Sequence, residues 1–243
     1  MPSDRPDLVI SPRPLNEYAR WLVKRIPFVF SRWGDGEWSA VLGRSGANTD
    51  KQPYTADLQA DLIRVLEDKP SYLLGLQPMA VRLLGADIAA WLRARDFWPA
   101  WEDSDVWHKA SRSGRIKPIV KALRTRRVLL VGPARLRGLA RSVPFAAFVE
   151  IPNRAAHARL PEMRANLQAA LTDFGPDGVV AVCAGMSANI LIHDYCGPKR
   201  TTIGPPRTTW IDFGAVWEPY IGHANRTYHA QVLARLAMEG TIR

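Results

Sequence analysis

The feature that most constrains the fold of this chain is the alternation of short apolar runs with amphipathic stretches. The clearest run, residues 127–133, has apolar residues at consecutive positions and ends in glycine and proline, as expected of a parallel strand buried on both faces. Similar runs occur at residues 28–33, 72–76, 148–152, 178–185 and 208–214. This alternation predicts an α/β fold, namely a Rossmann-like, open, mostly parallel sheet with helices on both faces.

Length and composition indicate a globular protein with one large core. The chain has 243 residues, 47% of them hydrophobic, which suits a single domain over residues 1–243. We expect an irregular insertion, rich in tryptophan and basic residues, around residues 97–126. No stretch resembles a signal peptide or a membrane span, and two cysteines are too few for a disulfide scaffold. We therefore expect a cytoplasmic protein of a bacterium, or of a virus in its host's cytoplasm.

The first long apolar run leads directly into two glycines and two carboxylates. Residues 28–38 are Phe-Val-Phe-Ser-Arg-Trp-Gly-Asp-Gly-Glu-Trp, which predicts a strand followed by a tight turn at Gly34 and Gly36. Asp35 and Glu37 should then leave the sheet together. Carboxylates at i and i+2 in a turning segment can converge on one Mg²⁺ or Mn²⁺ ion. The alternative is a simple Gly-Asp-Gly turn with a solvated glutamate.

Other predicted strands end in glycine or in polar residues that should lie at the same edge of the sheet. Gly132 and Pro133 end one run, Gly185 ends another just before Ser187, and Asp212 lies near the end of the last. Open α/β sheets bind ligands at the carboxyl ends of their strands, so this edge is the expected site. Ser187 could cap a helix whose N-terminus binds phosphate, or Gly185 could only permit a tight turn. Asp212 could be a base, a further carboxylate at the cation, a ribose ligand or a turn cap.

Positive charge is concentrated in one block of the chain. The formal net charge is +10, and residues 106–149 contain eleven Lys and Arg residues but no Asp or Glu. Such a block attracts polyanions, although a solvated basic helix has the same composition. The nearby tryptophans could stack on a sugar or a base, or they could fill the edge of the core. The candidate acceptor or nucleic-acid contacts are Trp101, Trp107, Lys109, Arg112, Arg115 and Lys117.

Four segments taken together resemble the GT-D-type glycosyltransferases, a family formerly classed as a domain of unknown function. They are Ser-Arg-Trp-Gly-Asp-Gly-Glu at residues 31–37, Val-Gly-Pro at 131–133, Gly-Met-Ser-Ala-Asn-Ile-Leu-Ile-His-Asp at 185–194 and Ile-Asp-Phe-Gly at 211–214. The resemblance spans residues 28–220 and implies a Rossmann-like fold that binds a nucleotide-sugar, typically a UDP-sugar. The segment Trp-Glu-Pro-Tyr at 217–220 departs from the family pattern, so acceptor contacts do not transfer.

The resemblance also implies roles for individual residues. Asp35 and Glu37 would hold a divalent metal, Mn²⁺ or Mg²⁺, that neutralises the diphosphate leaving group, and Arg32 would contact phosphate. The expected donor-binding residues are Arg32, Gly34, Gly36, Gly132, Pro133, Gly185, Ser187 and Asn189. The expected catalytic residues are Asp35, Glu37, His108 and Asp212. Apart from the resemblance, deprotonating the acceptor hydroxyl needs an acid–base group within hydrogen-bond reach; His108, Asp212 and Glu218 are the candidates, and the sequence does not choose among them.

The sequence thus predicts a metal-dependent glycosyltransferase that moves a sugar from a nucleotide-sugar to a hydroxyl. The basic block favours DNA as the acceptor, for example a hydroxylated or hydroxymethylated pyrimidine of the kind that viruses of bacteria use for protection. The cations of the block could bind the DNA phosphates, and Trp101 and Trp107 could stack on a base extruded from the duplex. The alternatives are transfer to a cell-surface saccharide or glycoprotein, and a non-catalytic nucleotide-binding module.

Overall fold

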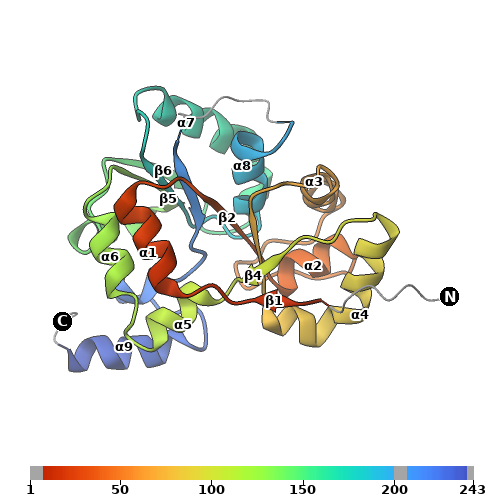
Figure 1. Ribbon diagram of the computed structural model, residues 1–243, viewed down its shortest axis with the longest axis horizontal. Helices are drawn as coiled ribbons and strands as arrows, with labels where there is room; N and C mark the ends of the chain where they lie inside the picture. Colours follow the sequence, from red (N-terminus) through yellow and green to blue (C-terminus); the bar gives the residue numbers. More distant parts are fainter. Residues whose placement is uncertain (1–7, 200–206, 240–243) are drawn as a thin grey trace.

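One sheet of eight parallel strands organises the protein (Figure 1). The computed structural model describes residues 8–199 and 207–239. The strand order across the sheet is β1-β4-β3-β2-β8-β7-β5-β6, and every pair is parallel. The strands are β1 (Ile10–Ser11), β2 (Val29–Trp33), β3 (Leu73–Leu76), β4 (Trp101–Asp103), β5 (Val128–Pro133), β6 (Ala147–Ile151), β7 (Val179–Val182) and β8 (Thr209–Asp212).

Helices cover both faces of the sheet. The α-helices are α1 (Leu15–Lys24), α2 (Asp35–Val41), α3 (Ala56–Glu67), α4 (Pro78–Ala94), α5 (Val106–Arg112), α6 (Lys117–Leu123), α7 (Leu160–Thr172), α8 (Ser187–Cys196) and α9 (His229–Met238). Three 3₁₀ helices join them, η1 (Ala134–Arg141), η2 (Ala156–Arg159) and η3 (Glu218–Ile221). The predicted α/β fold, with helices on both faces of a parallel sheet, is therefore confirmed.

Each face of the sheet has its own hydrophobic core. Successive residues of a strand point to opposite faces, and β5 shows this clearly. Its Leu129 and Val131 join the core formed with α2, α3, α4, α7 and α8, whereas Val128 and Leu130 join the core formed with α1, α5 and α6. A strand that supplies both cores has to be apolar at every position, which is the pattern seen in the sequence.

The structure contains all six predicted strands and two that were not predicted, β1 and β4. The expectation of an irregular insertion around residues 97–126 is wrong, because this segment contributes β4, α5 and α6. Strand β4 has only three residues, too few to show a periodic pattern. It is nevertheless paired with β1 and β3, so the tryptophan-rich segment is part of the sheet.

Candidate active site

A cavity of about 390 Å³ lies where the parallel strands end. Its walls include residues at or just after the ends of five strands, namely Gly34, Gln77, Pro133, Cys183 and Asp212. The predicted meeting of strand ends at one edge is thus confirmed. The neighbouring strands β5 and β7 continue in opposite directions across the sheet, β5 to β6 on one side and β7 to β8 on the other, and open α/β sheets bind their ligands at such a switch point.

The acid-bearing segment after β2 is the start of helix α2, and the predicted turn is wrong. Gly34 is the N-cap residue, and the Glu37 carboxylate accepts a hydrogen bond from the Gly34 N–H at 2.9 Å. The Asp35 N–H donates to Gln77 Oε1 at 3.2 Å. Side chains two residues apart in a helix do not face each other. Asp35 is accordingly exposed, whereas Glu37 is half-buried, although both line the cavity.

Two carboxyl groups in the cavity wall hold protons more tightly than usual. Burial raises the pKa of Glu37 to about 7, and the negative charge of Asp212 adds to this effect. Burial likewise raises the pKa of Asp212 to about 6, while the positive charge of Arg32 acts in the opposite direction. Perturbed acids of this kind gather at functional sites because a ligand or a reaction makes use of them.

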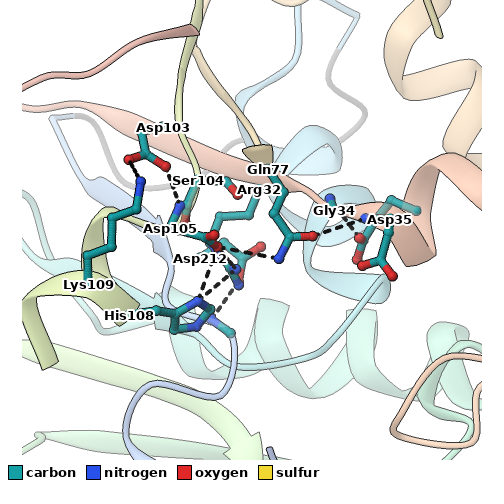
Figure 2. Close-up of polar contacts among 12 residues, drawn as sticks. Arg32, Gly34, Asp35, Gln77, Asp103, Ser104, Asp105, His108, Lys109 and Asp212 are labelled. Carbon is teal, nitrogen blue, oxygen red and sulfur yellow. Dashed lines mark hydrogen bonds and ion pairs between the residues drawn. The ribbon is translucent and has the colours of Figure 1, made fainter. Parts of the chain in front are cut away.

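Arg32, in β2, connects the strand ends to helix α5 (Figure 2). Its Nε donates to the Ser104 carbonyl at 2.9 Å, and its Nη2 lies 3.3 Å from His108 Nδ1 and 3.9 Å from Asp105 Oδ1. Gly214 has a φ of +55°, and a Cβ there would collide with the Arg32 guanidinium. The glycine after β8 therefore leaves room for the arginine.

His108 is neutral at ordinary pH and has one ring nitrogen without a partner. Burial and the nearby Arg32 lower the pKa of His108 to about 4. Its Nδ1 lies within 3.3 Å of Arg32, which can only donate, and within 3.4 Å of Asp105, which as a carboxylate can only accept. The two neighbours favour opposite tautomers. The buried Nε2, unpartnered within the described chain, can therefore present either a proton or a lone pair.

Helix α8 brings its first turn to the cavity from the end of β7. Gly185 adopts a φ of +54° between them. The N-cap residue is Met186 and Ser187 follows as the first helical residue, so the predicted capping by Ser187 is wrong. The Ser187 hydroxyl is buried and has no hydrogen-bond partner among the described residues. Unpaired N–H groups and a free hydroxyl at a helix N-terminus suit a phosphate oxygen.

Five buried polar atoms on cavity-lining residues lack a hydrogen-bond partner within the described chain. They are His108 Nε2, Arg135 Nε, Ser187 Oγ, Glu218 Oε2 and Tyr228 Oη. Buried polar groups in native proteins are nearly always paired, so these five atoms are available to a polar ligand that enters the cavity. The set contains donors, acceptors and groups that can be either, a mixture that suits a ligand rich in hydroxyl groups.

Sequence reasoning missed several residues that shape this cavity. Arg135 Nη1 donates to Asn153 Oδ1 at 2.6 Å, and its Nη2 pairs with Glu218. Arg226 Nη2 lies 2.9 Å from both carboxylate oxygens of Asp50. Arg135 follows the Val-Gly-Pro strand end almost directly, and that position was a usable signal. Arg226 belongs to a loop before α9, where no pattern in the sequence pointed to the site.

Two residues expected at the donor site serve the packing of the sheet instead. A Cβ on Gly132 would lie 2.8 Å from the Leu136 side chain, so this glycine permits η1 to pack on β5 and does not line the cavity. Asn189 is fully buried, and its Oδ1 contacts the Ser31 hydroxyl in β2. Asn189 therefore holds α8 against the sheet.

The six predicted acceptor contacts lie in three different environments. Trp101 and Trp107 are 2% and 0% exposed and belong to the cores on opposite faces of the sheet, so neither offers a ring for stacking on a base. The remaining predicted contacts are cations. Lys109 and Arg112 line the cavity, whereas Arg115 and Lys117 are exposed and lie outside it.

The fold is similar to that of known glycosyltransferases, although no family model and no curated sequence matches this chain. A solved structure of the domain of unknown function 1792, described as having a distinct glycosyltransferase fold, aligns with a TM-score of 0.60 at 18% identity, over 87% of this chain and 80% of that one. A glycosyltransferase (DUF1792) from Streptococcus sanguinis aligns with a TM-score of 0.62 at 16% identity, over 87% and 84%. The protein described here thus has the glycosyltransferase fold of the DUF1792 proteins.

Proposed function

We propose that this protein is a glycosyltransferase that moves a sugar from a nucleotide-sugar, such as a UDP-sugar, to a hydroxyl group. The observation that carries the proposal is the group of five unpartnered buried polar atoms in a cavity at the strand ends. The hydroxyl groups of a sugar and the oxygens of a diphosphate would pair these atoms. The fold shared with a glycosyltransferase from Streptococcus sanguinis supports this class of reaction.

Arg32 and the start of α8 are the proposed partners of the diphosphate. The Arg32 guanidinium borders the cavity, and only some of its N–H groups are used by Ser104 and His108. A guanidinium can bind two phosphate oxygens at once. The diphosphate would therefore meet the positive charge of Arg32 on one side. On the other it would meet the backbone N–H groups at the N-terminus of α8 and the Ser187 hydroxyl.

A divalent cation, Mn²⁺ or Mg²⁺, fits this site only together with its substrate. The described residues contain no group of three or more His, Cys, Asp or Glu arranged to hold a metal. Mg²⁺, however, commonly takes one or two carboxylates and completes its shell with phosphates and water. Asp35 and Glu37, which both line the cavity, are the proposed carboxylates. When bound, the cation supplies positive charge to the leaving diphosphate.

Asp212 is the proposed group that removes the proton from the acceptor hydroxyl. A general base works best when its pKa lies near the working pH, and the pKa of Asp212 is raised to about 6 whereas that of His108 is lowered to about 4. Glu218 is paired with Arg135. His108 is then left to orient a hydroxyl group through its free Nε2.

The buried positions of Trp101 and Trp107 weaken the case for DNA as the acceptor. DNA as the acceptor now rests on charge alone, through Lys109 and Arg112 in the cavity wall, because Trp101 and Trp107 are buried. The mixture of free donors and acceptors favours an acceptor that is itself rich in hydroxyl groups. We therefore place a saccharide, free or carried by a protein, ahead of a modified pyrimidine in DNA.

The reaction is tested with the purified protein and a panel of nucleotide-sugars. With Mn²⁺ and no acceptor, we expect slow release of UDP from one of them, stopped by EDTA and lost in an Asp35→Ala, Glu37→Ala double variant. Asp57→Ala, in the first turn of α3, is the matched control and should keep the activity. Nucleotide-sugar binding without turnover, unchanged in the double variant, would identify a non-catalytic binding module instead.

The acceptor is tested separately by transfer of radiolabelled sugar. Saccharide acceptors are compared with duplex and single-stranded DNA that contains hydroxymethylated pyrimidines. Transfer of label to a saccharide supports a saccharide as the acceptor. Label on DNA alone restores the acceptor indicated by charge.

A further inference from the structure

A second hollow, of about 740 Å³, lies between α6 and α9 and shares no lining residue with the candidate active site. We call it the α6–α9 groove. Its apolar lining residues are Ile116, Pro118, Val120 and Leu236, and its charged lining residues are Lys117, Lys121, Arg124, Arg235 and Glu239. Of the four apolar residues, Pro118 is exposed and Val120 half-buried, whereas Ile116 and Leu236 are buried. Apolar surface that stays exposed tends to mark a site of interaction.

The charges of the α6–α9 groove are strongly unbalanced. Its one acid, Glu239, is shared by Arg235 at 2.7 Å and Lys117 at 3.6 Å. Lys121 and Arg124 are exposed, and neither forms an ion pair with another described residue, although Arg124 Nε donates to the Ser142 carbonyl at 2.8 Å. Helix α6 belongs to the acid-free block of residues 106–149. The groove thus presents a part of that block which the candidate active site does not use.

Two exposed apolar side chains lie at the end of α1, beside the end of α6. Arg126 Nη1 donates to the Leu22 carbonyl at 2.6 Å and so holds the end of α1 beside the end of α6. Val23 and Ile26, at that end of α1, are 61% and 43% exposed, and the two residues between them are Lys24 and Arg25. Helices α1, α6 and α9 lie together on one side of the molecule, away from α4 (Figure 1).

We propose that the α6–α9 groove and the adjoining end of α1 dock on the surface of an anionic lipid bilayer. Lysine and arginine side chains would bind the anionic headgroups, Val23 and Ile26 would enter the boundary with the acyl chains, and the groove would face that boundary. No described helix is long and apolar enough to cross a bilayer, so the contact is peripheral. A nucleic acid would satisfy the cations but would leave the apolar groove in water, and the tryptophans that could stack on its bases are buried.

Vesicle flotation tests this proposal without any nucleotide-sugar, so it does not depend on the proposed reaction. We expect the full chain to float with vesicles of phosphatidylcholine and phosphatidylglycerol but not with phosphatidylcholine alone, and to dissociate as salt screens the charges. Each cation at a membrane surface changes the affinity about fivefold, so Lys121→Ala, Arg124→Ala should weaken binding about thirtyfold. Lys121→Ala alone, which breaks no described contact, should weaken it about fivefold.

A matched variant separates a docking surface from net charge. Arg82→Ala, Arg93→Ala removes two exposed cations from α4, which lies away from the groove (Figure 1), and it should float like the unaltered protein. Equal loss of binding in both double variants would overturn the proposal. The proposal would also be overturned if the protein did not bind anionic vesicles but bound duplex DNA tightly, and if Lys121→Ala, Arg124→Ala abolished the DNA binding.

Discussion

At the scale of single residues, the candidate active site contains a buried carboxyl group, that of Asp212, whose ionisation is unfavourable. Asp212 is 3% exposed at the end of β8 and its Oδ1 accepts a hydrogen bond from the Gly214 N–H at 2.8 Å. The positive charge of Arg32 lowers the pKa of Asp212, yet burial outweighs it and the pKa of Asp212 is still raised to about 6. A buried carboxyl group that remains partly uncompensated is costly to keep, and this cost supports the catalytic role that we propose for Asp212.

Replacing Asp212 by asparagine should stabilise the protein and abolish its activity. The folded protein holds the Asp212 proton more tightly than the unfolded chain does, because the pKa rises from 3.8 to about 6. Stability is therefore lost as pH rises through this range, and the loss reaches about 3 kcal/mol above it. Asp212→Asn keeps the bond to Gly214 and removes the anion, so without metal its free energy of unfolding should exceed that of the unaltered protein by about 1–3 kcal/mol at pH 8.

Denaturant unfolding at a series of pH values checks this expectation. The advantage of Asp212→Asn should shrink as pH falls toward 4, because the folded protein then holds the Asp212 proton, and it should vanish below the unfolded pKa of 3.8, where both states are protonated. In the unaltered protein, sugar transfer should rise with pH through the same range, because the base must be ionised to act. Full transfer activity in Asp212→Asn would refute the assignment of Asp212 as the base.

At the scale of secondary-structure elements, helix α2 determines how the two acids of the first motif are used. The helix begins at Asp35, so Asp35 and Glu37 lie in its first turn, where the partial positive charge of a helix N-terminus favours anions. Glu37 also closes the helix by binding the Gly34 N–H. One carboxylate therefore serves both the helix and the cavity, and its two roles can be separated by mutation.

Glu37→Gln and Glu37→Ala should differ in stability but not in activity. Glutamine keeps an oxygen for the Gly34 N–H, whereas alanine loses the cap and should lower the free energy of unfolding by about 1 kcal/mol. Both variants lose the charge and should lose nucleotide-sugar hydrolysis. Thr55→Ala, which removes the side-chain cap of α3, should cost similar stability and leave hydrolysis intact. A fully active Glu37→Gln would show that the carboxylate charge is not needed.

At the scale of the whole molecule, the cavity is closed by segments from distant parts of the chain. The loop before α3 supplies Asp50, and the loop before α9 supplies Arg226, which binds both oxygens of that carboxylate at 2.9 Å. Both residues line the cavity, and the two side chains are half-buried. This pair joins the two loops across the candidate active site, and an anionic ligand would compete with Asp50 for Arg226.

Breaking this pair should loosen the loop without unfolding the protein. Asp50→Ala should speed hydrogen exchange of residues 43–55 by a factor of about 1.4 to 5, since a partly exposed ion pair contributes about 0.2–1 kcal/mol. Asp87→Ala removes the Arg44–Asp87 pair, at 2.7 Å, from the same loop and is the control for general loosening. Equal exchange rates in the two variants would show that the Asp50–Arg226 contact has no special role.

The sequence by itself determined the sheet and the edge at which the site lies. Strands that are apolar at every position must be buried on both faces, and parallel strands must all end at one edge; β5 and β7 follow this rule with every residue buried. The first motif was placed at that edge because Gly34 directly follows β2. These conclusions depend on local patterns, and local patterns can be read along the chain.

Tertiary structure alone decided which side chains face the cavity. The pairing of Arg226 with Asp50 joins residues 176 positions apart, and Glu218 meets Arg135 across 83 positions. Trp101 and Trp107 have the residue type of a stacking surface, but the addition of β4 to the sheet and the packing of α5 put them inside the two cores. Burial and pairing depend on contacts between segments that are distant in the sequence. The periodicity of one segment does not indicate which other segment it will pack against.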